Sequence, residues 1–116
     1  MSDQDFKWYV VKVMSGQERK LKPLIEMELE RDGLDSFVKQ FLIPMEKVVQ
    51  LRKGKKVTKE RNYYPGYILV EAILNSEVQH AIRNVNGVIT FLGNGDTPVP
   101  LRDSEVNRIL GKMDDL

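Results

Sequence analysis

Side chains that could carry out catalysis are scarce in this sequence. His80 is the only histidine and cysteine is absent, so a nucleophile–base pair and a Cys/His metal site both lack their usual members. The glycines of Gly93-Asn94-Gly95 fit neither a phosphate-binding nor a dinucleotide-binding pattern. We therefore interpret His80 as a surface or interface residue. We expect a binding module rather than an enzyme, with no metal and no cofactor.

Positive charge gathers in one segment, although the formal net charge of the chain is only +1. The cations between residues 52 and 61 are Arg52, Lys53, Lys55, Lys56, Lys59 and Arg61, opposed only by Glu60. Two interpretations are open. The charge protects the edge of a hairpin from pairing with other strands, or the patch contacts nucleic-acid phosphates through Arg52, Lys53, Lys55 and Lys56.

A tyrosine-rich corner follows the basic segment. Tyr63 and Tyr64 precede Pro65-Gly66, and Tyr67 opens an apolar run. Proline fixes its own φ and favours an extended residue before it, whereas glycine permits a turn that most residues resist. Rings held on such a rigid corner suit a protein-binding anchor. We expect Tyr64 to be exposed, and Tyr67 to be either core or contact.

Hydrophobic periodicity predicts the elements that position these side chains. Strands are expected over 7–14, 37–43, 46–51, 55–62, 67–72 and 88–92, with a turn at Lys53-Gly54 and a loop over 93–100. Helices are expected over 15–31, from 75 or 76 to 85, and along the stripe Val106, Ile109, Leu110 and Met113. The order β-α-β-β-β-β-α-β-α indicates an α+β fold, an α/β sandwich of ferredoxin-like or RNP-like type in which three helices flank an antiparallel sheet.

The first helix and the first strand carry more specific expectations. Ser15 and Glu18 form a capping box, in which each side chain would satisfy a backbone amide of the other. The apolar stripe of this helix consists of Leu21, Leu24, Ile25 and Leu29. Pro23 lies inside the helix, where we expect it to remove a hydrogen bond and cause a kink. Successive side chains of the first strand point to opposite faces, and apolar residues occur on both, so we expect both faces to be largely buried.

Composition places the chain among single globular domains. Its 116 residues are 41% hydrophobic and 30% charged, which is enough to bury a core. No apolar run approaches the ~20 residues that a membrane span needs, and no secretory signal is visible. We expect one domain over 1–116, a monomer located in the cytoplasm.

Several segments together resemble the N-terminal domain of NusG-type transcription elongation factors. The segments are WYVV at 8–11, SGQE at 15–18, IPMEKVV at 43–49, YPGYILV at 64–70, VNGV at 85–88 and PVPL at 98–101. They are similar to the W-Y-V-V, S-G-x-E, V-P-x-E-x-V-V, F-P-G-Y-V-L-V, x-x-G-V and P-x-P-[LI] segments of the family. They occur in the order and with the spacing of the family, from Trp8 to Met113.

The resemblance implies a function without chemistry. Domains of this family bind the clamp helices of RNA polymerase through an apolar depression and bridge the cleft, which modulates elongation, pausing and termination. By matching position, the depression would involve Lys12, Tyr64, Pro65, Gly66, Tyr67, Ile109 and Met113. Gln79 and His80 would face the far side of the cleft, and Asn84 would lie near upstream DNA or the displaced DNA strand.

Departures from the family pattern define the alternatives. Tyr64 stands where the family usually has phenylalanine, Val85 replaces a polar residue, and we expect this chain to lack the small KOW domain of the family. One alternative is an operon-specific NusG paralogue that acts as an antiterminator. Another is an RNA-binding module of the RRM type, which this sequence fits poorly because Leu69 and Ala72 stand where that motif needs aromatic rings.

Overall fold

The computed structural model describes residues 6–94 and 97–114, with side chains up to 111. Within these residues the helices are α1 (Glu18–Arg31), α2 (Ser76–Arg83) and α3 (Asp103–Asp114), together with a 3₁₀ turn, η2 (Asp35–Phe37). The strands are β1 (Lys7–Val13), β2 (Val38–Leu42), β3 (Met45–Arg52), β4 (Lys55–Asn62), β5 (Tyr67–Ala72), β6 (Val88–Phe91), β7 (Gly93–Asn94) and β8 (Thr97–Pro98).

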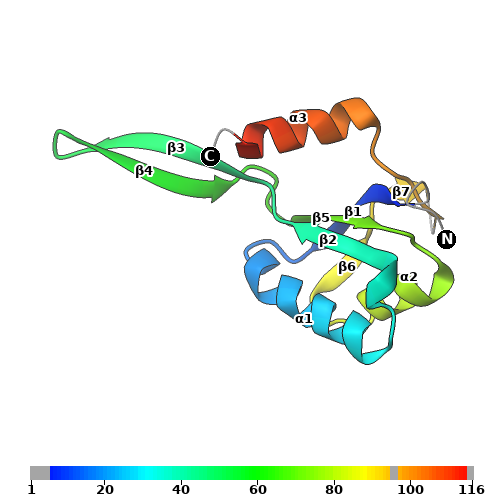
Figure 1. Cartoon of the computed structure of the whole chain (residues 1–116). Coiled ribbons are helices and arrows are strands. Elements are labelled where there is room, and N and C mark those ends of the chain that lie inside the picture. The colour runs from blue at the N-terminus through cyan, green and yellow to red at the C-terminus, as the bar shows by residue number, and fades with distance from the viewer. Residues whose placement is uncertain (1–5, 95–96, 115–116) are drawn as a thin grey trace.

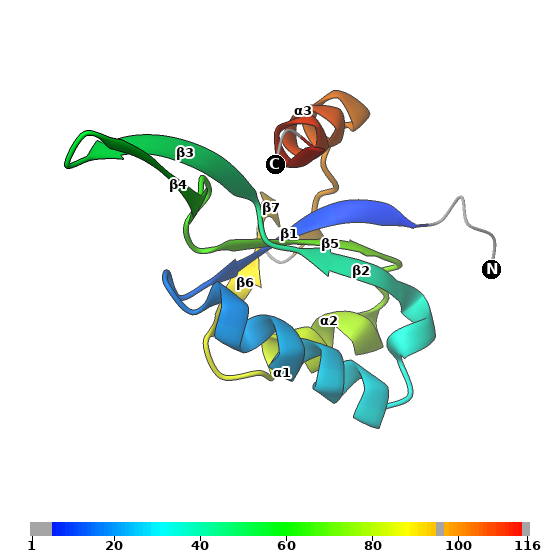
Figure 2. The same ribbon diagram turned by 60° about the vertical axis from the view of Figure 1, so that its left-hand side comes forward.

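A four-stranded antiparallel sheet organises the molecule, in the order β2-β5-β1-β6. The helices α1 and α2 cover one face of this sheet, and α3 lies over the other (Figures 1 and 2). The predicted α+β fold, with an antiparallel sheet flanked by three helices, is therefore confirmed for the described part of the chain.

Two apolar cores lie on the two faces of the sheet. The larger core, between the sheet and α1 and α2, includes Val11, Ile25 and Ile68, each with no exposed surface. The smaller core, beneath α3, consists of Val10, Leu69 and Ile109 with partly buried neighbours. Since neighbouring residues of β1 belong to different cores, the predicted burial of both of its faces is confirmed.

The start of α1 differs from the sequence prediction. The helix begins at Glu18 rather than Ser15, and no side chain caps its first turn. Gly16 has φ +88°, which turns the chain sharply between Ser15 and the helix. The predicted Ser15–Glu18 capping box is therefore wrong: the Glu18 side chain reaches Gly16 and Asn62 instead of Ser15. The Gly16 amide donates to Glu18 Oε1 at 2.6 Å, and Asn62 Nδ2 donates to Glu18 Oε2 at 2.9 Å.

The body of α1 follows most of the predicted stripe. Leu21, Ile25 and Leu29 are buried at a spacing of four residues. Leu24 was expected beside them, but it is 43% exposed because the row at every fourth position faces the sheet and leaves Leu24 on its flank. The helix continues through Pro23, as expected, and the kink there stays a prediction.

A long two-stranded hairpin, β3 and β4, projects from the body of the molecule (Figures 1 and 2). Lys53 and Gly54 both have positive φ, +53° and +78°, which is the geometry of a two-residue type I′ turn. The predicted turn at Lys53-Gly54 is confirmed. Other predicted boundaries differ from the structure. The turn η2 precedes β2, α2 ends at Arg83 rather than 85, and the segment predicted as a loop over 93–100 contains the short pair β7–β8.

Pro23 gives a test of the cost of proline within α1. Its ring cannot donate to the carbonyl of residue 19, and its side chain is exposed, so little burial is lost on replacement. Pro23→Ala should raise the free energy of unfolding by about 1–2 kcal/mol, after allowance for the freer unfolded chain. Urea unfolding measures this change. Lys20→Ala, also exposed on α1, is the control and should change it by at most ~0.5 kcal/mol. No gain at Pro23 would mean that α1 accommodates the proline without cost.

Candidate functional site

A tight turn over residues 64–67 forms the rim of the candidate site. The Tyr67 amide donates to the Tyr64 carbonyl at 3.2 Å, and Gly66 has φ +88°. Proline at the second position and glycine at the third are the residues that a type II turn prefers. The Val13 amide donates to the Gly66 carbonyl at 2.8 Å, so the turn is fixed to the end of β1.

Behind this turn lies an apolar hollow of about 180 Å³ between α3 and the sheet, which we call the α3 hollow. It is lined by Val10, Pro44, Tyr64, Tyr67, Leu69, Leu92, Leu101, Glu105, Arg108 and Ile109. Three of these, Tyr64, Tyr67 and Ile109, were predicted from the sequence to lie together. Glu105 and Arg108 are the charged residues in this lining.

The two tyrosines most concerned with the site differ in burial. Tyr64 is 39% exposed, which confirms its predicted exposure, and its ring lies 4.8 Å from that of Tyr63, centroid to centroid. The Tyr64 amide donates to Asn62 Oδ1 at 2.8 Å, so the backbone before the proline is held as well. Tyr67 is half-buried against the smaller core and also lines the hollow, so it belongs to the core, and its contact with a partner stays a prediction.

Tyr63 was not predicted as a site residue, yet it positions α3. Its hydroxyl donates to the Ile109 carbonyl at 3.1 Å, which ties the end of β4 to the helix. Burial raises the pKa of Tyr63, with smaller contributions from Tyr64 and Glu46, while Arg108 lowers it. Because a raised pKa keeps the phenol protonated, this donor persists throughout the neutral pH range.

Other lining residues were also missed by the sequence prediction. Val10 and Leu69 alternate within strands, and this periodicity could have indicated their shared face. Leu92 was expected at the end of the strand 88–92 and Leu101 in the PVPL segment, but neither pattern placed them at the hollow. Both lie outside regular strands and helices in the structure. The Leu101 amide donates to the Trp8 carbonyl at 2.7 Å, a long-range contact that brings the segment before α3 onto the sheet.

The remaining predicted positions divide between the two sides of the molecule. Lys12 is exposed and lies opposite Tyr67 in the register of β1 and β5, so it stands beside the α3 hollow. Met113 belongs to α3, and its side chain lies outside the described residues. Gln79 and His80 lie on α2, across the sheet from α3 (Figure 2). The Gln79 side-chain amide donates to the Leu74 carbonyl at 2.9 Å, whereas His80 is exposed.

The predicted nucleic-acid contacts lie in two places. The four candidates from the basic segment, Arg52, Lys53, Lys55 and Lys56, are exposed at the tip of the β3–β4 hairpin. Asn84 is exposed at the C-terminal end of α2. The structure does not bring these two groups together, and their contact with nucleic acid stays a prediction.

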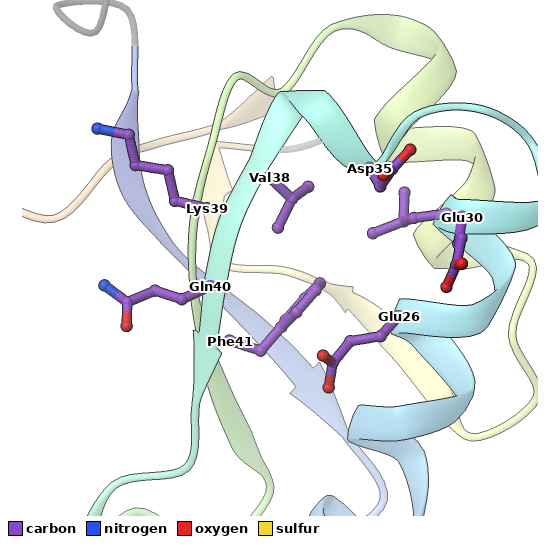
Figure 3. A pocket seen from close by; sticks show the side chains of 8 residues that line it. Glu26, Glu30, Asp35, Val38, Lys39, Gln40 and Phe41 are labelled. Carbon is purple, nitrogen blue, oxygen red and sulfur yellow. The ribbon is translucent and has the colours of Figure 1, made fainter.

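A second hollow lies between α1 and the edge strand β2 (Figure 3). Glu26, Glu30 and Asp35 surround it, and Phe41 points into it from β2 (Figure 3). Glu26 Oε1 accepts from Lys22 Nζ at 2.9 Å within the helix. Since none of the predicted site residues lines this hollow, we assign it no part in the candidate site.

Within the described residues, no three His, Asp or Glu side chains are grouped so that they could hold a metal ion. Nor does any helix in this part of the chain have the length and apolar character that crossing a membrane requires. The fold and the site thus define a class of protein: an α+β domain that presents an apolar, tyrosine-edged hollow beneath one helix.

Comparison with known proteins identifies the family. The model of the family "Transcription termination factor nusG" matches residues 6–110, and this chain belongs to the NusG family. The chain is 38% identical over 110 residues to the transcription termination/antitermination protein NusG of Chlamydia trachomatis, with 95% of this chain and 60% of that protein covered. It is 35% identical over 109 residues to the protein of the same name from Vibrio vulnificus, with 93% and 60% covered.

The chain therefore spans about three fifths of the length of these curated relatives. The family consists of transcription factors rather than enzymes, which confirms the expectation that this chain is not an enzyme. Membership of the NusG family also decides against the RRM-type alternative.

Solved structures give the same assignment. Thermotoga maritima NusG superimposes with a TM-score of 0.75 at 33% identity, covering 99% of this chain and 61% of that one. The N-terminal domain of NusG (NGN) from Methanocaldococcus jannaschii superimposes with a TM-score of 0.58 at 20% identity, covering 88% and 98%. At that identity the second comparison shows the fold alone.

The 64–67 turn depends on glycine at position 66, which can be tested. A Cβ at this position would lie 3.3 Å from the Val13 carbonyl oxygen, and φ +88° is strained for any other residue. Gly66→Ala should lower the free energy of unfolding by about 1–3 kcal/mol. Gly111→Ala is the matched control: a Cβ there meets nothing within 4 Å, and alanine in α3 should stabilise by up to ~1 kcal/mol. Thermal melts compare the two, and equal effects would contradict the importance of the turn.

Proposed function

We propose that this domain binds RNA polymerase through the α3 hollow, at the clamp helices, and bridges the cleft to modulate elongation, pausing and termination. Membership of the NusG family supports a function in transcription, because the relatives are named transcription termination/antitermination proteins. The single observation that carries the proposal is the α3 hollow itself, in which three residues expected from the family pattern come together at one apolar surface.

The size of the hollow favours a protein partner. Its volume of about 180 Å³ is below the ~300–1,000 Å³ of pockets that enclose small-molecule ligands. Its lining is mainly apolar, with two tyrosines at the edge and the charged Glu105 and Arg108 beside them. Apolar side chains from one face of a partner helix fit such a surface, in the way that amphipathic helices bind hydrophobic grooves.

The rigidity of the corner supports a high affinity for each contact. Tyr64 is held by its backbone bond to Asn62 and by the turn that follows it. A backbone that is already ordered loses little entropy when the corner docks, so more of the contact energy appears as binding free energy. Tyrosine is also among the residues that most often dominate protein interfaces.

Bridging a cleft requires two contact surfaces that face in different directions. The α3 hollow lies beneath α3, and Gln79 and His80 belong to α2. These two helices lie on opposite faces of the sheet (Figures 1 and 2). A domain that contacts both walls of a cleft binds the closed form better than the open form. Binding therefore raises the ratio of closed to open polymerase. The ratio rises tenfold for every ~1.4 kcal/mol by which the domain binds the closed form more tightly.

Replacement of Tyr64 tests the proposed function. Tyr64→Ala should weaken binding to core RNA polymerase by roughly 30-fold, which corresponds to ~2 kcal/mol for an aromatic anchor. Tyr64→Phe should bind about as well as the parent, because the ring provides the contact. A fluorescence titration of core polymerase measures both, and a pause assay should lose the effect of the domain with Tyr64→Ala alone.

Controls separate binding from folding. Tyr64 is 39% exposed, so Tyr64→Ala should lower the free energy of unfolding by no more than about 1 kcal/mol. Leu24→Ala is the matched surface control, since Leu24 is 43% exposed on α1, across the sheet from the hollow, and it should leave binding unchanged. Normal binding by Tyr64→Ala would contradict the proposed site, and an unfolded variant would mean that Tyr64 is part of the core.

A further inference from the structure

The register of the β3–β4 hairpin separates its side chains into two faces. Because residues opposite each other in an antiparallel pair share a face, each pair can be assigned. One face carries the pairs Glu46–Arg61, Val48–Lys59, Gln50–Val57 and Arg52–Lys55. The other face carries Met45–Asn62, Lys47–Glu60, Val49–Thr58 and Leu51–Lys56. The cations that are contiguous in sequence are therefore divided in space.

Contacts at the base of the hairpin show which way each face points. Asn62 bonds to Glu18, and Glu60 forms an ion pair with Arg19 at 3.8 Å, so their face lies on the side of α1. The opposite face lies on the side of α3, which packs against β3. We call these the α1-side face and the α3-side face of the hairpin.

Both carboxylates of the hairpin are already engaged by arginines. Glu46 Oε1 accepts from Arg61 Nε at 2.8 Å on the α3-side face, and Glu60 pairs with Arg19 on the α1-side face. Among the described residues, no carboxylate lies within ion-pair distance of Arg52, Lys55 or Lys59. All three are exposed on the α3-side face, which leaves three uncompensated charges there.

The α1-side face is different in character. Val49 and Leu51 are 63% and 74% exposed on it, next to the single uncompensated lysine near the tip, Lys56. Apolar side chains on this face offer nothing to a polyanion, which water solvates strongly. On the α3-side face the two valines, Val48 and Val57, are half-buried.

We infer that the α3-side face of the hairpin is a phosphate-binding face for nucleic acid, in which Arg52, Lys55 and Lys59 contact the backbone. Lys55 and Lys59 are four residues apart on one strand, or ~14 Å, and Arg52 lies directly opposite Lys55. Since duplex DNA carries one phosphate per ~3.4 Å of each strand, the three cations span several successive phosphates. Contacts of this kind do not depend on base sequence.

Adjacent lysines on opposite faces supply a sharp test. Lys55→Gln and Lys56→Gln make the same change in charge one residue apart, at exposed positions. Affinity for a 20-base-pair DNA duplex and for a single strand of the same sequence is measured without polymerase across a range of salt concentrations. Lys55→Gln should reduce the slope of log K against log salt by ~0.9 on duplex and ~0.7 on single strand. Lys56→Gln should keep the slope of the parent.

The double variant Lys55→Gln/Lys59→Gln should reduce the slope by about twice as much, ~1.8 on duplex. Equal losses for Lys55→Gln and Lys56→Gln would overturn the inference, because net charge rather than one face would then explain binding. Unchanged slopes in all variants would overturn it too.

A titration of core polymerase free of nucleic acid keeps this inference distinct from the proposed function. The lysine variants should bind core polymerase like the parent, whereas Tyr64→Ala should keep the DNA slope of the parent. Weaker polymerase binding by Lys55→Gln with an unchanged DNA slope would identify an acidic protein surface as the ligand and overturn the inference.

Discussion

The candidate site depends on one backbone hydrogen bond, in which the Val13 amide donates to the Gly66 carbonyl at 2.8 Å. This bond joins the end of β1 to the 64–67 turn, and the turn connects the hairpin to β5. Together with the bonds that Asn62 makes to Glu18 and to the Tyr64 amide, this bond holds the base of the hairpin and the rim of the hollow against the sheet. A residue with a Cβ at position 66 would crowd the Val13 carbonyl, so glycine is a geometric requirement there.

The two faces of the sheet have different functions: the face covered by α1 and α2 carries the larger core, and the face beneath α3 carries the candidate site. Most fully buried side chains lie with α1 and α2, whereas the core beneath α3 consists of Val10, Leu69 and Ile109 with partly buried neighbours. Hydrophobic stabilisation scales with buried area, so the larger core provides most of it. The surface beneath α3 can therefore remain incompletely filled, as a hollow must be. The Tyr63 hydroxyl donates to the Ile109 carbonyl and so fixes α3 to the end of β4 beside the hollow.

Features fixed by local chemistry could be predicted from the sequence. The bounds of β5, a cap of α2 at residue 75 or 76 and the Lys53-Gly54 turn each depend on neighbouring residues only. The structure shows the strand and the turn as predicted and decides for Asn75 as the cap. The start of α1 could not be predicted, because the turn at Gly16 competes with the capping box. The contributions of Leu92 and Leu101 to the hollow arise from long-range packing, which leaves no local signal.

The hairpin has a further consequence for how related sequences can change. No residue of the described hairpin, 45–62, belongs to either core, so residues can be inserted or removed near the tip without disturbing the cores. Successive side chains of a strand point to opposite faces, so inserting or removing one residue in a strand would exchange the cationic and apolar faces. Tip length should therefore vary by two residues in each strand. The reach of the arm can then evolve in steps of ~7 Å while its orientation is inherited.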